Sequence, residues 1–221
     1  MKIWMALCMT LIVATEAGHT QSINWRSLDD DHRNIVALSP GYDYGATLQF
    51  GYGRSLPFIR PVVLGANFTI PMGRDLLDDF KIRLGAQVEL VEFSGFAATL
   101  RIASIFRRYE TPLVRMVSFG SEFALLVGYY RPTWFFAVEG GFDKAITTHM
   151  KHADVMRTFF PGIRDGWYVP TGGNFSYGIE GGAAIVRGLE LSLRAGATHA
   201  QPRDESAVIP LYMQVGITTT F

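Results

Sequence analysis

From residue 44 to residue 221, the sequence alternates apolar and polar side chains in segments of about 10 to 15 residues, separated by turn-forming residues. The third segment shows the pattern most clearly, with Phe80, Ile82 and Leu84 on one face and Lys81 and Arg83 on the other. A period of two residues predicts strands with one apolar and one polar face, and therefore an all-β chain. Nine segments alternate in this way, at residues 45–53, 62–70, 80–90, 96–107, 117–129, 134–143, 175–185, 189–197 and 211–221.

Charge is segregated between the two faces of these segments. The apolar faces hold about fifty positions and no charged residue, although at 18% charged residues random placement would put about nine there. Contact with lipid would enforce this, because a charge facing lipid at the midplane costs roughly 2 to 4 kcal/mol. Glycines and charges of both signs share the other face, which suits the crowded interior of a narrow barrel better than the surface of a soluble sandwich or lipocalin-like barrel. We therefore expect a closed antiparallel transmembrane β-barrel. The charged residues on the polar faces are Lys81, Arg83, Glu89, Arg101, Arg107, Glu122, Glu139, Asp143, Glu180, Glu190 and Arg194.

The connections between segments predict the direction of the strands. Short connections near 55–58, 92–95, 130–133 and 187–188 alternate with longer ones near 71–79, 108–113, 144–173 and 200–210. Bacterial outer-membrane barrels keep short turns in the periplasm and long loops outside, and have an even number of strands. A tenth strand is therefore expected at Asn34–Ser39, turning at Pro40 and Gly41, although residues 35–38 are all apolar. We predict about ten strands, with eight as the alternative.

The first residues have the pattern of an export signal. Lys2 supplies a positive charge, residues 3–14 an apolar stretch and residues 15–17 a small-residue cleavage site. The predicted organisation is a cleaved signal peptide at 1–17, a polar segment at 18–33 that lies in the periplasm or folds into the barrel, and the barrel at 34–221. Cys8, the only cysteine, would leave with the signal. Because 20 basic residues balance 20 acidic ones, no overall charge favours nucleic acid as a partner.

The C-terminal residue Phe221 follows a run of alternating apolar residues that includes Met213, Val215 and Ile217. This ending resembles the terminal signal that the barrel-assembly machinery recognises in outer-membrane proteins of Gram-negative bacteria. The resemblance covers about ten residues at the end of the last predicted strand. It implies assembly by that machinery and a location in the bacterial outer membrane, and it implies no particular activity.

The charges expected inside the barrel have two interpretations. They form an ion-paired plug, with Arg101 and Arg194 opposing Glu122, Glu139 and Glu180, or they line a narrow aqueous path. Ten strands enclose little space and buried charges need partners, so we expect the plug. The candidate interior residues are Lys81, Arg83, Glu89, Arg101, Glu122, Glu139, Glu180, Glu190 and Arg194.

Outside the barrel, Arg108 and Arg115 flank one outer loop on the lipid-facing parity. Since guanidinium groups match the geometry of phosphate, we expect them to contact lipopolysaccharide. In the long loop at 144–173, the spacing of His149, His152, Met156 and Phe160 predicts one face of a helix. Such a helix would form a lid over the barrel mouth, or a metal site from His149, His152 and Asp154. Two histidines three residues apart are an incomplete ligand set, so we favour the lid and expect neither metal nor cofactor.

Two sites raise the question of an enzyme. His199 lies at the outer end of a predicted strand on the lipid-facing parity, but the His-x-Ser spacing of lipid A deacylases is absent because Gln201 occupies the serine position. The acidic run 29–31 followed by His32 superficially resembles omptin proteases, but its expected position is the periplasmic side. The sequence therefore favours a non-enzymatic outer-membrane protein with a structural or surface-interacting role. The alternatives are a narrow channel for small solutes and, third, a lipid-modifying enzyme.

Overall fold

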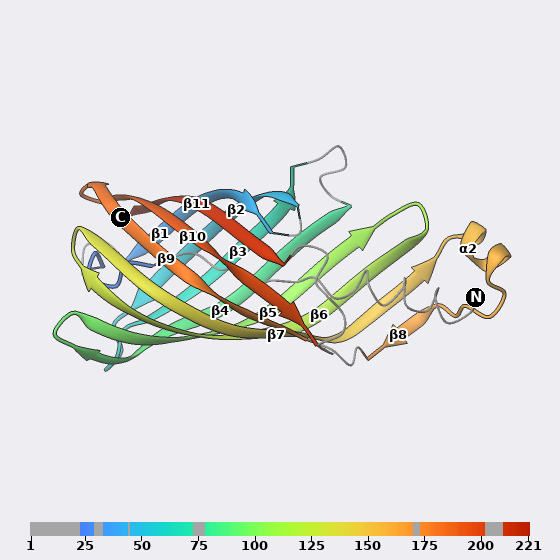
Figure 1. Ribbon diagram of the computed structural model, residues 1–221, viewed down its shortest axis with the longest axis horizontal. Helices are drawn as coiled ribbons and strands as arrows, with labels where there is room; N and C mark the ends of the chain where they lie inside the picture. The colour runs from blue at the N-terminus through green and yellow to red at the C-terminus, as the bar shows by residue number, and fades with distance from the viewer. Residues whose placement is uncertain (1–22, 29–32, 44, 73–77, 170–172, 202–209) are drawn as a thin grey trace.

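The chain forms a closed barrel of ten antiparallel strands (Figure 1). The computed structural model describes residues 23–28, 33–43, 45–72, 78–169, 173–201 and 210–221, so the expected signal peptide at 1–17 lies outside the described residues. The short strand β8 (Gly166–Tyr168) and the helix α2 (Asp154–Phe159) lie outside the ring. The ring consists of β1 (Asn34–Tyr42), β2 (Ala46–Leu56), β3 (Val62–Pro71), β4 (Asp79–Phe93), β5 (Phe96–Glu110), β6 (Val114–Arg131), β7 (Trp134–His152), β9 (Asn174–Val186), β10 (Leu189–Ala200) and β11 (Leu211–Thr220).

Each ring strand pairs with its neighbour in the chain, and β1 pairs with β11 to close the ring. The tenth strand predicted at Asn34–Ser39 is confirmed as β1. The predicted turn at Pro40 and Gly41 is wrong, because β1 continues to Tyr42 and Gly41 still pairs with both β2 and β11. Closure leaves no unpaired edge in the ring, so the backbone groups of the wall are satisfied without water.

Alternation along each strand puts apolar side chains outside and polar ones inside. In β6, Phe123 is 49% exposed, whereas its neighbour Glu122 is 2% exposed. The same contrast holds between Leu84 and Arg83 of β4. A soluble barrel has the opposite arrangement, since its apolar faces pack inward. The predicted closed barrel with a charged interior is therefore the fold of this chain.

The wall is much taller on one side than on the other. β5, β6 and β7 have 15, 18 and 19 residues, against 9 to 11 for β1 to β3, and Figure 1 shows β6 and β7 reaching past the ring toward β8 and α2. We call this end the loop end, and the opposite end, where the short turns and the C-terminus lie, the turn end. Two predicted loops are therefore partly strand: β5 continues to Glu110, and β7 continues to His152.

The helix predicted around the histidines is wrong in its position. His149 and His152 belong to β7, and α2 begins only at Asp154. A bulge explains why alternation did not reveal this part of β7. Phe119 pairs with Thr147 and Gly120 with Ala145, so Ile146 is an extra residue that reverses the parity of those that follow. Among the described residues, no helix has the length and apolar character needed to cross a membrane.

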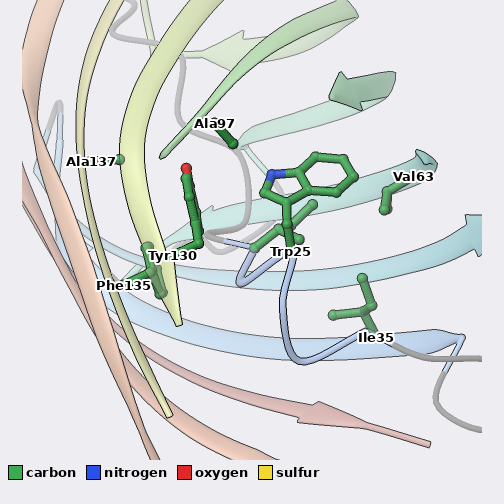
Figure 2. Packing of buried hydrophobic residues seen from close by; sticks show 8 residues of the cluster. Trp25, Ile35, Val63, Ala97, Tyr130, Phe135 and Ala137 are labelled. Atoms are coloured by element: carbon green, nitrogen blue, oxygen red, sulfur yellow. The ribbon is translucent and has the colours of Figure 1, made fainter. Parts of the chain in front are cut away.

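Residues 23–28, which we call the strap, lie inside the turn end of the barrel (Figure 2). Trp25 is 5% exposed and packs in an apolar cluster with side chains that include Ile35, Tyr130 and Phe135. Asn24 shapes the turn: its side chain accepts a bond from the Arg26 N–H and donates one to the carbonyl of Arg131. Of the two positions expected for the segment before β1, these residues take the one inside the barrel.

Candidate functional site: the charged lumen

A set of mostly charged side chains from neighbouring strands lies across the middle of the lumen, and we call it the belt. Each member comes from a different strand, because only one inward position per strand lies at that height in the staggered wall. All six charged members are 7% exposed or less. Their side chains point inward because they stand at the inward positions of the alternating strands. The belt consists of Arg83 of β4, Arg101 of β5, Glu122 of β6, Glu139 of β7, Glu180 of β9, Arg194 of β10 and the uncharged Tyr212 of β11.

Glu139 is the acceptor shared by three members of the belt. Arg194 donates to both carboxylate oxygens, with an Nε–Oε1 distance of 2.6 Å. Arg101 Nη2 lies 3.3 Å from Oε2, and the Tyr212 hydroxyl donates to Oε1 over 2.7 Å. Bonds from two guanidinium groups and a hydroxyl offset the cost of burying this carboxylate.

Arg101 links the two halves of the belt. Its Nε lies 3.4 Å from Glu122, while its Nη2 binds Glu139. Arg83 completes the pairing of Glu122 at 3.1 Å, and on the far side Arg194 lies 3.9 Å from Glu180. Three arginines therefore face three glutamates, and the belt is neutral as a whole. A neutral, paired set is the form in which charges are tolerated in an enclosed space.

Two glycines make room for the tyrosine of the belt. A Cβ atom at Gly178 of β9 or Gly196 of β10 would overlap the hydroxyl of Tyr212. The hydroxyl end of Tyr212 therefore lies against the backbone of two neighbouring strands, and the guanidinium carbon of Arg194 lies 5.6 Å from the centroid of its ring. The high glycine content of the inward faces has, at this point, a specific packing reason.

Further pairs fill the lumen at the loop end. The Lys81 ammonium lies 3.5 Å from Asp43, and this lysine is 0% exposed. Arg107 donates two bonds of 3.1 Å to Asp79. In the same part of the barrel, the Asn174 amide donates to Asp143 over 2.7 Å. These contacts satisfy polar groups above the belt.

At the turn end the strap covers the lumen. Arg26 reaches Glu92 at 2.9 Å and Glu89 at 3.7 Å, so the strap is held by ion pairs as well as by Trp25. A small space of about 30 Å³ remains beside Arg83 and Arg101. A larger pocket of about 190 Å³ lies between the strap and β9 to β11, with Glu190, 7% exposed, in its lining. The described side chains thus occupy the lumen at three heights.

The structure places every predicted interior charge inside the barrel. Lys81 lies with the loop-end pairs, Glu89 and Glu190 lie near the strap, and the other six form the belt. Arg101 and Arg194 contact the three glutamates that the sequence set against them. Sequence reasoning left open whether the strap enters the barrel, and it missed Tyr212. The inward parity of Tyr212 is readable from its apolar neighbours in β11, whereas Trp25 stands in a polar segment and gives no periodic signal.

The other predicted sites lie on the outer surface. Arg108 and Arg115 lie at the loop end of β5 and β6, with side chains 33% and 49% exposed. His199 Nε2 lies 3.0 Å from the Tyr177 hydroxyl, and the two rings stack on the outside of the wall. The acidic run at 29–31 lies outside the described residues. Residues of the predicted assembly signal point outward from β11 and its end: Met213, Val215, Ile217 and Phe221.

The histidines of β7 have partners other than a metal. His149 packs edge-on against Trp167, and the ring of His152 lies 3.0 Å from Asp165. In the described part of the chain, no group of three or more His, Cys, Asp or Glu side chains is arranged to hold a metal ion.

The solved structures that are similar to this chain include two barrels. A KdgM porin in complex with disordered oligogalacturonate matches with a TM-score of 0.40 and 8% identity, over 85% of this chain and 99% of the porin. The β domain of the Bordetella autotransporter BrkA matches with a TM-score of 0.37 and 12% identity, over 86% of this chain and 99% of that domain. No family model and no curated protein matches the sequence.

Proposed function

We propose that this chain is an integral outer-membrane β-barrel protein with a closed lumen, which has a structural or surface-interacting role and does not conduct solutes. The single observation that carries the proposal is the belt: six buried charges, paired with one another, that span the lumen from β4 to β10. The loop end is then extracellular and the turn end periplasmic.

The outer surface supports the membrane location. Its large apolar side chains are exposed between two aromatic girdles. Soluble monomeric proteins rarely expose an apolar surface of this extent. Along β5, ten residues separate Phe96 in one girdle from Phe106 in the other, which at a tilt of about 40° corresponds to about 26 Å. Outer-membrane barrels have an apolar band of roughly 25 Å. The turn-end girdle contains Phe96, Tyr129 and Trp134, and the loop-end girdle contains Phe68, Phe80, Phe106, Phe119 and Trp167.

The energetics of the belt support a closed lumen. Opening a path would require the arginines to leave their glutamates, and breaking a buried ion pair costs about 3 to 5 kcal/mol. The strap adds a second obstruction at the turn end, where Trp25 fills the lumen among apolar side chains. An open pore would instead have charged groups facing a continuous column of water.

Single-channel recording tests the proposal. The protein is refolded into a planar lipid bilayer, and insertion is verified by heat-modifiable migration on gels. We expect no stable openings, because both the belt and the strap obstruct the lumen.

The contradicting result is a stable conductance of the native protein that changes in Arg101→Gln or Glu122→Gln. That result would favour the narrow channel for small solutes. Leu125→Val is the matched control, since Leu125 lies on the same strand as Glu122 but faces outward.

A further inference from the structure

The outer surface at the loop end has a cluster of cations that spans β5, β6 and β7. Strand register puts the members in two rows across neighbouring strands, all on the outward face. The row nearer the end contains Glu110, Arg115 and Lys151, and the next row contains Arg108, Val117, His149 and Trp167.

One carboxylate orients two of the cations. Arg108 Nη2 donates to Glu110 Oε2 over 2.5 Å, and Arg115 Nη2 donates to Oε1 over 2.7 Å. A guanidinium has five N–H donors, so each arginine keeps donors for another acceptor. Lys151 is exposed and, within the described residues, has no ion-pair partner.

The cations gather on one side of the acidic residues. Asp78 lies next to Glu110, where the Glu110 N–H donates to the Asp78 carbonyl over 2.7 Å. Three basic residues therefore oppose two acidic ones, and the net charge is +1. Lys151 and Arg115 lie on the side of the rows away from Asp78, around the outward side chain of Val117. The surface over Val117 is thus the positive part of the cluster.

The height of the cluster matches the headgroup region of a membrane. Arg108 lies two residues beyond Phe106 of the loop-end girdle, which is about 5 Å farther along the barrel axis. Trp167 borders the cluster: the centroid of its ring lies 5.0 Å from that of His149 and 6.3 Å from that of Phe119. Lipid phosphates lie just outside the apolar band, where an aromatic girdle ends.

We propose that a phosphate group of an outer-leaflet lipopolysaccharide binds over Val117, held by Arg108, Arg115 and Lys151. Guanidinium groups bind phosphate oxygens in pairs, and the lysine adds a point charge. The acyl chains of the same lipid lie against the aromatic girdle below. The inference rests on the proposed outer-membrane location. It goes beyond the proposed function by naming a lipid partner and by including Lys151 of β7 in the site that binds it.

Native mass spectrometry of the refolded full chain tests the lipid site. The probes are bisphosphorylated lipid A and the same lipid with both phosphates removed. We expect the native protein to retain the phosphorylated form preferentially, and Arg115→Glu with Lys151→Glu to weaken that binding by about tenfold or more, since each basic residue near a lipid surface contributes about 1 kcal/mol. Arg131→Glu is the matched control, because Arg131 is an outward arginine beside Tyr129 of the turn-end girdle.

The outcomes separate this inference from the proposed function. A native chain that inserts into bilayers but binds both lipids equally contradicts the lipid site alone, and one that does not insert contradicts the membrane location. Equal binding by the native and doubly substituted proteins also overturns the site. If millimolar inorganic phosphate displaces the lipid, the site is one for free phosphate and the proposal is wrong. Should the charge reversals prevent folding, Arg115→Gln with Lys151→Gln gives the same comparison.

Discussion

At the scale of single residues, Glu139 determines the stability of the belt. Its carboxylate accepts bonds from Arg101, Arg194 and Tyr212. Glu139→Gln keeps the volume but removes one of three negative charges, leaving three buried arginines with two carboxylates. We expect the free energy of unfolding to fall by about 3 to 5 kcal/mol, measured by urea denaturation in lipid vesicles.

The control for this prediction applies the same change to a partly exposed ion-paired carboxylate, Glu110, whose side chain is 24% exposed. Glu110→Gln removes the partner of Arg108 and Arg115 at the outer rim, where solvent screens the charges. Its effect on the free energy of unfolding should be much smaller. An equal loss in the two variants would contradict the view that burial makes the belt pairs matter.

At the scale of elements, the segment between β7 and β9, which contains α2 and β8, depends on Asp165. The backbone N–H of His152 donates to this carboxylate over 2.9 Å, the His152 ring lies 3.0 Å away, and Arg157 donates over 2.5 Å. The bond from the His152 N–H, with these side-chain contacts, lowers the pKa of Asp165 from its ordinary value of 3.8. Because the pKa is lower in the folded protein, the ionised carboxylate stabilises this segment fully above pH 3.8. The stabilisation is lost as the pH falls through the lowered pKa of the folded protein.

Hydrogen exchange measures this dependence. The protection factor of the His152 amide should be constant above pH 3.8 and should fall only below it, as Asp165 takes up a proton at its lowered pKa. Asp165→Asn should show lower protection at the higher pH and no such step. A step of the same size in Asp165→Asn would assign the transition to another group.

The elements also show which parts of the fold the sequence could predict. Alternation identified the strands wherever the outward face is apolar and the inward face is polar. It failed in β1, since Trp25 of the strap packs on Ile35 and both faces of that strand are apolar. It also failed in β7 beyond the bulge at Ile146, and at Arg108 and Glu110, whose outward charges were taken for a loop.

For the site, parity predicted which charges face inward but not their heights. The height of a side chain depends on the stagger between strands, which each register sets separately. The sequence therefore indicated the partners of Arg101 and Arg194 as a group, and could not distinguish the shared acceptor Glu139 from Glu180. The sequence could not decide between the periplasm and the barrel interior for the strap, because this segment lacks periodicity and its place depends on the space that the finished barrel leaves.

At the scale of the whole molecule, the belt and the strap are two obstructions in series. A solute must pass both, so removing either one leaves the other in place. Trp25→Ala empties the centre of the strap cluster. Arg101→Ala with Glu139→Ala removes the middle of the belt while the pairs Arg83–Glu122 and Arg194–Glu180 remain, so the belt stays neutral.

The two obstructions predict a non-additive effect on conductance. In planar bilayers, the Trp25→Ala protein and the belt variant should each stay closed or open only briefly, because the remaining obstruction limits the current. The protein with all three substitutions should show stable openings. Trp25→Phe in the belt variant is the matched control and should stay closed, since phenylalanine keeps most of the apolar contact in the strap. If the belt variant alone conducted as well as the triple variant, the strap would be no barrier, and closure would rest on the belt alone.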